Sequence, residues 1–269
     1  MAVAPVTVAT YNIAGAHETF CHDNVLNALQ SLNADVICLQ EVLGDDPLHT
    51  QAHRLADDLR MNCVFGKAHQ ERVFGNAILS RFPLTHRHEI ELPRGSLMRD
   101  DGSRMPGQNE RRAALAVVVS PFKDVSAYDF LCVCTHVGIF NSAEESTDAH
   151  VPCERIGQFV NTEALKDTPA LLAGDFNCRW AEPFAGVVAH LDRNWNIYPS
   201  AGTKTNKGDD SKHKIDYICD RGRRRWQMKG GLTHAVRNDK TDYGDGHQPS
   251  DHLLLVAVWE PLPLPESHS

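Results

Sequence analysis

Hydrophobic positions along the chain form short runs that are separated by polar turns. Residues 6–10 alternate between apolar and polar side chains, as a half-buried strand does. Further runs of strand length lie at 35–40, 77–80, 113–120, 130–135, 169–173, 215–219, 232–236 and 253–259. Helical spacing predicts helices over 24–32, 53–59, 142–166 and 181–191, the third interrupted near Pro152. Strands with interspersed helices indicate a layered α/β or α+β domain.

Residues 84–110 differ from the rest of the chain. They contain two prolines and three glycines and show little apolar periodicity. We expect a long excursion from the core, and long loops inside compact domains are often functional. The segment and its edges are rich in arginine: Arg81, Arg87, Arg94, Arg99, Arg104, Arg111 and Arg112. Residues 199–212 are polar and are expected to form another loop.

The composition, with 42% hydrophobic and 23% charged residues, is that of an ordinary globular protein. For 269 residues we expect one domain over residues 1–260 and a flexible, proline-rich tail over 261–269. The formal net charge of −8 differs from the basic surface of a non-specific nucleic-acid binder. Any surface that binds phosphate therefore has to be local, or made by a metal ion.

The eight cysteines include no C-x-x-C pair, so their spacing does not indicate a zinc site. Cys132 and Cys134 would share one face of a strand, which indicates packing in the core. The start of the chain lacks the basic residues and apolar stretch of a signal peptide. No apolar run approaches the roughly 18 residues of a membrane span. We therefore expect a reduced intracellular protein, cytoplasmic or nuclear, without a transmembrane segment.

Polar groups stand at the ends of several predicted strands, where a rigid scaffold presents functional side chains. They are Asn12, Glu41, Asp175, Asn177, Asp251 and His252. Each of them alone is also explained by a turn or a cap. A carboxylate such as Glu41 at the end of a buried strand is costly unless it is paired or metal-bound, and its hard oxygens suit Mg²⁺. His252 titrates near neutral pH and can act as an acid or a base.

Two further residues become candidate site residues because they occur together with these polar groups. Asp216 lies within the strand at 215–219, and if it faces inward it needs a partner, for which His252 is the natural candidate. His136 ends the strand at 130–135. A lone histidine in such a place is more often structural than catalytic.

Together these segments read TYNI, LQEV, THV, GDFN, IDYI and SDH, in this order, over residues 10–252. In this the chain resembles the endonuclease/exonuclease/phosphatase superfamily, whose fold is deoxyribonuclease I-like. The resemblance implies an α/β fold, a four-layer sandwich of two mostly antiparallel β-sheets flanked by helices. It also implies a metal-dependent phosphoric ester hydrolase that uses Mg²⁺, with Mn²⁺ as an alternative.

The same resemblance implies a role for each residue around the metal and the phosphate. Glu41 would be a metal ligand, with Asn12 and Asp251 beside the metal. An arginine before the strand at 113–120 would bind phosphate, and Arg112 fits better than Arg111.

The remaining roles concern the water and the leaving group. Asp175 and Asn177 would orient the nucleophilic water and the phosphate. Asp216 would orient His252, which would hydrogen-bond the phosphate or serve as the general base. His136 would contact the scissile phosphate or assist the leaving group. The sequence does not decide whether Asp175 or His252 is the base.

The substrate stays open at this level, because family members share their site chemistry and differ in their loops. The first hypothesis is a nuclease or phosphodiesterase that acts on nucleic acid. Residues 221–225 (RGRRR) could contact backbone phosphates, and Trp226 could stack a base, although a solvated turn explains the arginines as well. The alternatives are a phosphomonoesterase acting on phosphoinositides or small phosphorylated molecules, which the acidic charge favours, and a catalytically silent binding module.

A zinc site is a weaker alternative. His49 and His53 have the spacing to bind zinc from one helix face, but His49 is expected to precede the helix. Two solvated histidines explain the pair better.

Overall fold

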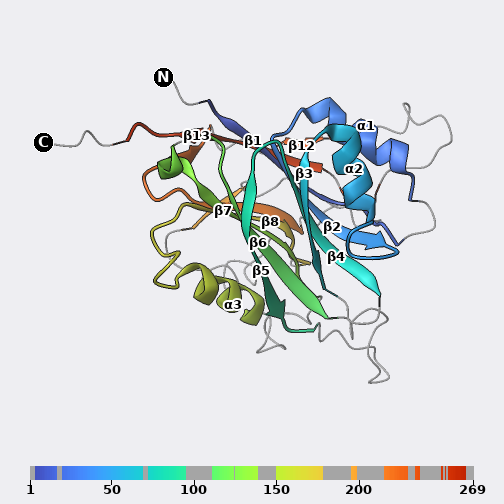
Figure 1. Ribbon diagram of the computed structural model, residues 1–269. Coiled ribbons are helices and arrows are strands. Elements are labelled where there is room, and N and C mark those ends of the chain that lie inside the picture. The colour runs from blue at the N-terminus through green and yellow to red at the C-terminus, as the bar shows by residue number, and fades with distance from the viewer. Residues whose placement is uncertain are drawn as a thin grey trace, which may run out of the picture.

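The computed structural model describes residues 4–16, 20–68, 72–94, 111–123, 125–138, 150–177, 195–198, 215–229, 234–236, 250, 252 and 254–264 (Figure 1). Its helices are α1 (His22–Leu32), α2 (Gln51–Leu59), α3 (Val151–Val160) and the short 3₁₀ helix η1 (Ser126–Tyr128). Its strands are β1 (Val6–Asn12), β2 (Val36–Gly44), β3 (Asn62–Lys67), β4 (Val73–Ser80), β5 (Leu84–Leu92), β6 (Arg112–Val119), β7 (Phe130–His136), β8 (Ala170–Asp175), β9 (Asn196–Tyr198), β10 (Asp216–Arg221), β11 (Trp226–Met228), β12 (His234–Val236) and β13 (Leu254–Pro261).

Within this part of the chain the strands form two sheets. The first runs in the order β11-β13-β1-β2-β4-β3, with β12 also paired to β13, and the second runs β5-β6-β7-β8-β10-β9. The pairs β1–β2 and β7–β8 are parallel, and the other pairs are antiparallel. Each sheet therefore has one parallel pair near its middle. The expectation of two mostly antiparallel sheets is confirmed.

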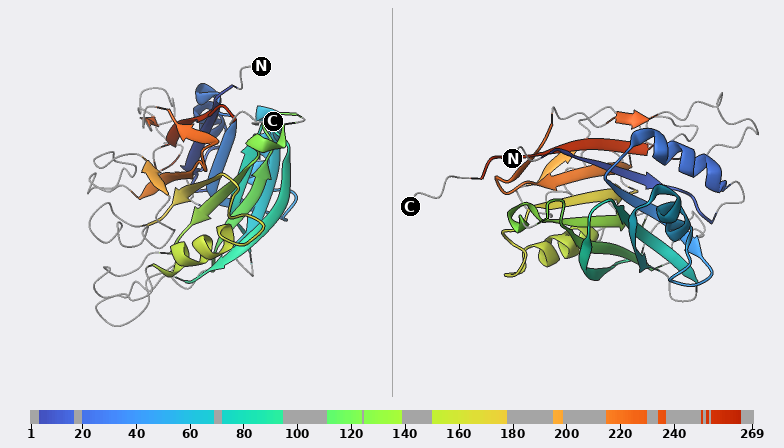
Figure 2. Two further views of the ribbon diagram at one scale, coloured as in Figure 1. Left: turned by 90° about the vertical axis from the view of Figure 1, so that its left-hand side faces the viewer. Right: turned by 45° about the horizontal axis from the view of Figure 1, so that its top comes forward.

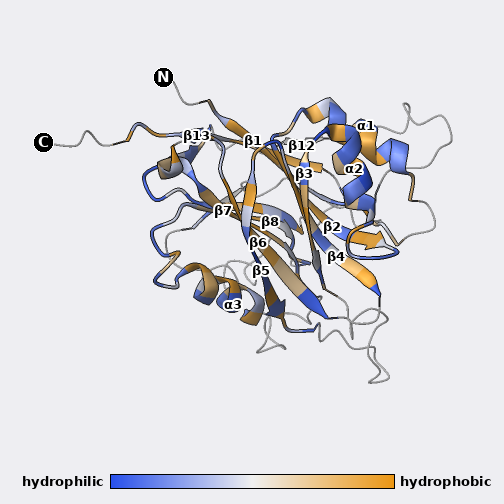
Figure 3. Cartoon of the chain, in the orientation of Figure 1, coloured by the Kyte–Doolittle hydropathy of each residue, from blue (hydrophilic) through white to orange (hydrophobic). Residues whose placement is uncertain are grey.

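The two sheets and the helices outside them form four layers (Figure 2). Three apolar clusters hold these layers together. One lies between the sheets and combines side chains of β2 and β13 with those of β7 and β8. A second joins the outer face of the first sheet to α1 and α2, and a third joins the outer face of the second sheet to α3. The helices carry both hydrophobic and hydrophilic positions, as helices on the outside of a sandwich must (Figure 3). The fold is the expected α/β sandwich.

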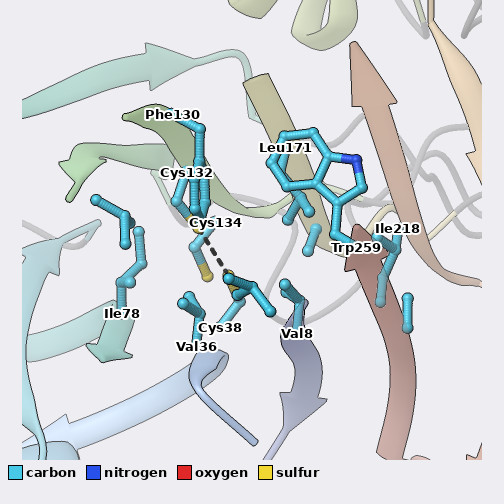
Figure 4. Close-up of a cluster of buried hydrophobic side chains, with 14 of the residues drawn as sticks. Val8, Val36, Cys38, Ile78, Phe130, Cys132, Cys134, Leu171, Ile218 and Trp259 are labelled. Carbon is cyan, nitrogen blue, oxygen red and sulfur yellow. Dashed lines mark hydrogen bonds between the residues drawn. The ribbon is translucent and has the colours of Figure 1, made fainter. Parts of the chain in front are cut away.

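The cysteines between the sheets are packing residues (Figure 4). Sγ of Cys38 on β2 lies 3.6 Å from Sγ of Cys132 on β7, and Cys134 points into the same cluster. All three are free thiols. Hydrogen bonding to Cys132 and Cys134, together with burial, raises the pKa of the Cys38 thiol. Such thiols are inert, which agrees with the packing role expected for Cys132 and Cys134.

The long excursion predicted for 84–110 is wrong in its first part, because residues 84–92 form the edge strand β5. This strand pairs with β6 along its length. The hydrophobic pattern of β5 does not indicate a strand, because only Ile90 and Leu92 are buried and the other positions are polar or partly exposed. Residues 95–110 lie outside the described residues, with the arginines at 99 and 104.

The helix predicted over 142–166 is shorter than expected. α3 begins at Val151, so Pro152 lies in its first turn, where a missing N–H costs nothing, and it does not interrupt the helix. Residues 161–168 form turns after α3. The helix predicted over 181–191 and the loop predicted over 199–212 lie outside the described residues. Among the helices that are described, none is long and apolar enough to cross a membrane.

Candidate functional site

Strand direction brings the candidate residues to one end of the sandwich. In the parallel pair β7–β8, His136 stands opposite Asp175, at the last position of both strands. The strand β10 is antiparallel to β8, so its first residue, Asp216, also lies opposite Asp175. In the other sheet, the last residue of β1, Asn12, stands opposite Gln40 of β2. The ends of parallel strands and the starts of antiparallel strands thus meet at the same edge.

A β-bulge in β2 turns Glu41 toward this edge. The pairing with β4 shifts between Leu39 and Val42, so Gln40 and Glu41 together face one residue of β4. Regular alternation would send Glu41 to the helix side of the sheet, where Leu39 and Val42 pack. Instead Gln40 contacts Cys134 of the opposite sheet, and Glu41 reaches the site with a left-handed backbone, φ 57°. Such a conformation costs roughly 1–3 kcal/mol and points to a functional constraint.

The side-chain amide of Asn12 joins the two sheets at the site. Its Nδ2 donates to Oε1 of Glu41 at 3.0 Å and to Oδ2 of Asp175 at 3.1 Å. Its Oδ1 accepts from the backbone N–H of Ala14. The hydroxyl of Ser250 donates to the carbonyl of Asn12 at 2.6 Å and accepts from the N–H of His252. Asn12 is therefore fixed on all sides, and it holds two carboxylates close together.

Asp175 occupies the centre of the site. Its Oδ1 accepts from the backbone N–H of Asn177 at 2.8 Å, which closes an Asx turn, and its Oδ2 accepts from Asn12. The Nε2 atoms of His136 and His252 both lie 3.6 Å from Oδ2. Burial raises the pKa of Asp175 to about 7, and the neighbouring His252 opposes this shift. The turn expected as the alternative reading of Asp175 is present, within the site.

His252 is oriented by Asp216, as the sequence predicted for an inward-facing aspartate. Nδ1 of His252 lies 2.9 Å and 3.1 Å from the two carboxylate oxygens of Asp216, and both residues are buried. Because Nδ1 is engaged by Asp216, Nε2 is directed toward Asp175 and the site. Tautomer and orientation of the imidazole are thus set by one carboxylate.

His136 has hydrogen-bond donors on both sides of its ring. Nη1 of Arg112 lies 3.4 Å from Nδ1, and Nδ2 of Asn177 lies 3.1 Å from Nε2. Burial, then the charges of Arg112 and His252, lower the pKa of His136 well below its usual value. His136 is therefore neutral at physiological pH and adds no positive charge to the site. Arg112 provides that charge, whereas Arg111 is paired with Glu91 at the surface.

Gly174 is required by the close approach of two strands. Its φ is 151°, and a Cβ at this position would lie 1.9 Å from the carbonyl oxygen of Thr135 on β7. The glycine lets β8 and β7 pair at the point where Asp175 and His136 emerge.

The donor set fits a hard divalent cation. Glu41 and Asp175 direct oxygens at the same amide hydrogen-bond donor, and Asp216 adds a buried carboxylate nearby. Oxygen atoms of Asp175 and Asp216 and a ring nitrogen of His252 lie within 4.8 Å of one another, close enough to bind one ion. The raised pKa of Asp175 indicates a buried carboxylate whose charge is poorly compensated by the protein alone. Asp251, predicted as a third metal group, lies outside the described residues.

The arginine-rich segment at 221–225 lies away from the site. Asp216 and Arg221 stand at opposite ends of β10, about 16 Å apart at about 3.3 Å per residue. Arg221 is buried, donates to Asn161 and to three backbone carbonyls, and so cannot contact a substrate. Trp226 is buried against Phe130 and Trp259, so the proposed base stacking on Trp226 is wrong. Residues 223–225 form a turn, as the alternative interpretation expected, in which Arg224 is exposed and Arg223 and Arg225 are half-buried.

The histidines considered for zinc have other roles. His49 lies before α2, as expected, and its exposed ring contacts Asp46 at 2.7 Å. His53 completes a capping box with Thr50 at the start of α2. Among the described residues the pair does not converge on a shared point with other ligands. The zinc alternative is not supported.

Two buried polar residues of the site region were not singled out in the sequence. Ser250 precedes Asp251 in the SDH segment, and only the fold shows that it ties His252 to Asn12. Gln51 is the first residue of α2, and its side chain bonds to Gly15, which follows β1, and to Leu43, which follows the bulge. Hydrogen bonds between distant segments leave no periodic signal in a sequence, so neither residue could be found there.

Comparisons with known proteins agree with this fold. The sequence profile of the endonuclease/exonuclease/phosphatase family matches residues 9–252. The uncharacterized protein YbhP of Escherichia coli strain K12 is 29% identical over 186 residues, which cover 63% of this chain and 66% of YbhP, so the match spans just under two thirds of that relative. The human nocturnin catalytic domain with bound sulfate has a TM-score of 0.67 at 19% identity, over 96% of this chain and 93% of that one. ANGEL2, a 2′,3′-cyclic phosphatase, has a TM-score of 0.67 at 16% identity, over 95% of both chains. At these identities the two structures show a shared fold.

Proposed function

The chain belongs to the endonuclease/exonuclease/phosphatase family, whose members hydrolyse phosphoesters, and we propose that it is a Mg²⁺-dependent phosphodiesterase. The observation that carries this proposal is the position of Asp175. Its carboxylate has a pKa of about 7, lies between the Nε2 atoms of two histidines and is held by two asparagines. A proton acceptor with a pKa near neutrality, fixed beside phosphate-binding groups, suits the activation of water.

Glu41 would hold the divalent ion, with Asn12 beside it and Asp251 as a further candidate. When bound, Mg²⁺ would neutralise phosphate charge and stabilise the charge that develops on the leaving oxygen. Mn²⁺ has similar ligand preferences and could replace it.

The proton of the attacking water would pass to Asp175. Its Oδ2 faces the site, and Asn177 holds Oδ1 through its backbone N–H, so the carboxylate cannot rotate away. In this assignment Asp175 is the base. His252, whose Nδ1–H donates to Asp216, would in its imidazolium form also donate from Nε2–H to a phosphate oxygen.

The phosphate would be bound by Arg112 and His136. Arg112 is a buried cation that lies against His136. Because His136 is neutral, it would act as a hydrogen-bonding group, and Arg112 would supply the positive charge. Asn177 would share this role, since its Nδ2 lies beside His136.

Nucleic acid is the first substrate class to test, because ANGEL2, of the same fold, is a 2′,3′-cyclic phosphatase with a solved complex with adenosine-2′,3′-vanadate. The surface gives this class less support than the sequence suggested. Arg221 and Trp226 are buried, and Arg87 and Arg111 are paired with Glu89 and Glu91.

A small phosphorylated molecule, such as an inositol phosphate, is the second candidate. It is favoured by the net charge of −8 and by the distance between the arginine turn and the site. A small substrate needs only the local charge of Arg112 and a metal, and no basic track.

The test is hydrolysis by the full chain with Mg²⁺ or with EDTA. The substrates are single- and double-stranded DNA, RNA, a 2′,3′-cyclic nucleotide, a 5′-phosphotyrosyl oligonucleotide and inositol phosphates. Mg²⁺-dependent cleavage that is lost in Asp175→Asn and kept in Asp167→Asn, a surface control, is the expected result. Hydrolysis of inositol phosphates alone would favour the second candidate. A chain that neither binds Mg²⁺ nor turns over any ester would be a silent binding module.

A further inference from the structure

The bulge that presents Glu41 is held by a closed ring of hydrogen bonds. The carbonyl of Glu41 accepts from the N–H of Gly15 at 3.1 Å, and the carbonyl of Gly15 accepts from Nε2 of Gln51 at 2.8 Å. Oε1 of Gln51 then accepts from the N–H of Leu43 at 2.9 Å, two residues after Glu41. One carboxamide thus links the segment after β1 to the segment after the bulge.

The ring leaves no space for a side chain at position 15, so Gly15 cannot be replaced by a larger residue without a clash. A Cβ on Gly15 would lie 2.1 Å from Oε1 of Gln51 and 2.4 Å from the carbonyl oxygen of Glu41. The three groups are therefore in direct contact, and the side chain of Gln51 is buried. Buried polar groups in a complete network define one conformation, because breaking any bond leaves an unsatisfied partner.

Gln51 is itself fixed by the helix that it begins. Thr50 is the N-cap of α2, and His53 completes a capping box with it. The following turn packs Ala52, Leu55 and Ala56 against the first sheet. The helix thus carries the carboxamide to the bulge as a rigid element.

We propose that Gln51 is a positioning residue for Glu41, and that it sets the affinity of the site for its divalent cation. The inference rests on the proposed function, in which Glu41 binds that cation. Gln51 does not touch the site. It holds the left-handed backbone of Glu41 in place, so that the carboxylate stays 3.0 Å from Asn12 and faces Asp175. Residues that orient metal ligands typically change metal affinity about ten- to a hundredfold when they are replaced.

The test is a calorimetric titration of the full chain with Mn²⁺, without substrate. Gln51→Leu keeps the apolar part of the side chain and removes both hydrogen bonds. We expect its Kd for Mn²⁺ to rise at least about tenfold, and high Mn²⁺ to restore kcat. Gln30→Leu, the same change at an exposed position of α1, should leave Kd unchanged. Where Gln51→Leu does not fold, Gln51→Glu is used, since it keeps the acceptor for Leu43 and loses the donor to Gly15.

Amide hydrogen exchange over residues 13–15 and 41–43 reports on the ring independently of any metal. Faster exchange in Gln51→Leu, together with weaker Mn²⁺ binding, supports the proposal. Faster exchange with an unchanged Kd overturns it, because the ring would then serve stability alone. Unchanged exchange also overturns it. If the wild-type protein binds no Mn²⁺, the proposed function is overturned, and the role of Gln51 with it. That outcome differs from equal Mn²⁺ binding by wild type and variant, which overturns the role of Gln51 alone.

Discussion

Nδ2 of Asn12 lies 3.1 Å from Oδ2 of Asp175, although the two residues are 163 positions apart and belong to different sheets. This hydrogen bond crosses the end of the sandwich and stabilises the ionised form of Asp175, lowering its pKa against the effect of burial. The contact couples the assembly of the two sheets to the protonation of the central carboxylate. Its loss should therefore be visible in the pH dependence of the reaction.

Asn12→Ala removes this donor, and the pKa of Asp175 should rise further. The acid limb of the profile of kcat/KM against pH should move to higher pH by about half a unit to one unit, because the base is ionised only at higher pH. Asn27→Ala, an exposed asparagine of α1, is the matched control and should leave the profile unchanged. A profile of Asn12→Ala that superimposes on that of the wild type would mean that Asp175 does not control the acid limb.

Asp175→Asn should change the pH dependence of stability in the absence of metal. The folded-state pKa of Asp175, about 7, is above the unfolded value of about 3.9, so the folded state holds the proton more tightly. The stability contributed by this proton is complete below the unfolded pKa and is lost as pH rises toward 7. In EDTA, the wild type should thus lose about 1–3 kcal/mol between pH 5 and pH 8 relative to Asp175→Asn.

The measurement for Asp175→Asn is the Tm of both proteins between pH 5 and pH 8. Addition of Mn²⁺ should raise the wild-type Tm more at pH 8 than at pH 5, since a cation bound at Glu41 favours the ionised form of the neighbouring Asp175. The same slope of Tm against pH in both proteins would refute the role of Asp175 in this dependence.

Asp216 and His252 should act as one unit. Asp216→Asn removes the charge that orients the imidazole and should lower kcat by about a hundredfold or more. His252→Ala should cost a similar factor, and the double variant should be no worse than the worse single variant. The control is Asp58→Asn, which changes the exposed ion pair between Asp58 and His22, and kcat should be unaffected. Additive losses would show that the two residues act separately.

Arg112→Ala should raise KM about ten- to a hundredfold, because it removes the cation beside His136. Arg224→Ala makes the same change in the exposed turn at the far end of β10 and should leave KM within about twofold. Steady-state kinetics on the preferred substrate of the panel test both. A comparable rise in both variants would show that the substrate reaches the far end of the sandwich, as a long nucleic acid would.

The sequence was sufficient for the fold class and for most of the central strands. Apolar runs such as 130–135 and 169–173 have the length of strands, and both form strands that are buried on both faces of a sheet. The edge strand β5 was not predicted from the sequence. One of its sides faces solvent and carries Thr, His, Arg and Glu, so its sequence resembles that of a loop. Arg221 and Trp226 were likewise considered as substrate contacts at the surface, although both are buried. Burial of Arg221 depends on backbone carbonyl groups that only the folded chain brings to it.

For the site, too, some properties follow from the sequence and others only from the tertiary structure. The sequence by itself determined the chemistry, since the order of Asn12, Glu41, Asp175 and His252 at strand ends indicates carboxylates and an imidazole gathered for a phosphoester. Only the tertiary structure decided how these groups act. The side of the sheet that Glu41 faces depends on a one-residue bulge. The neutral state of His136 depends on burial and on the charges of Arg112 and His252, and the pKa of Asp175 depends on burial. These are properties of distances between segments far apart in the chain, and local sequence does not contain such distances.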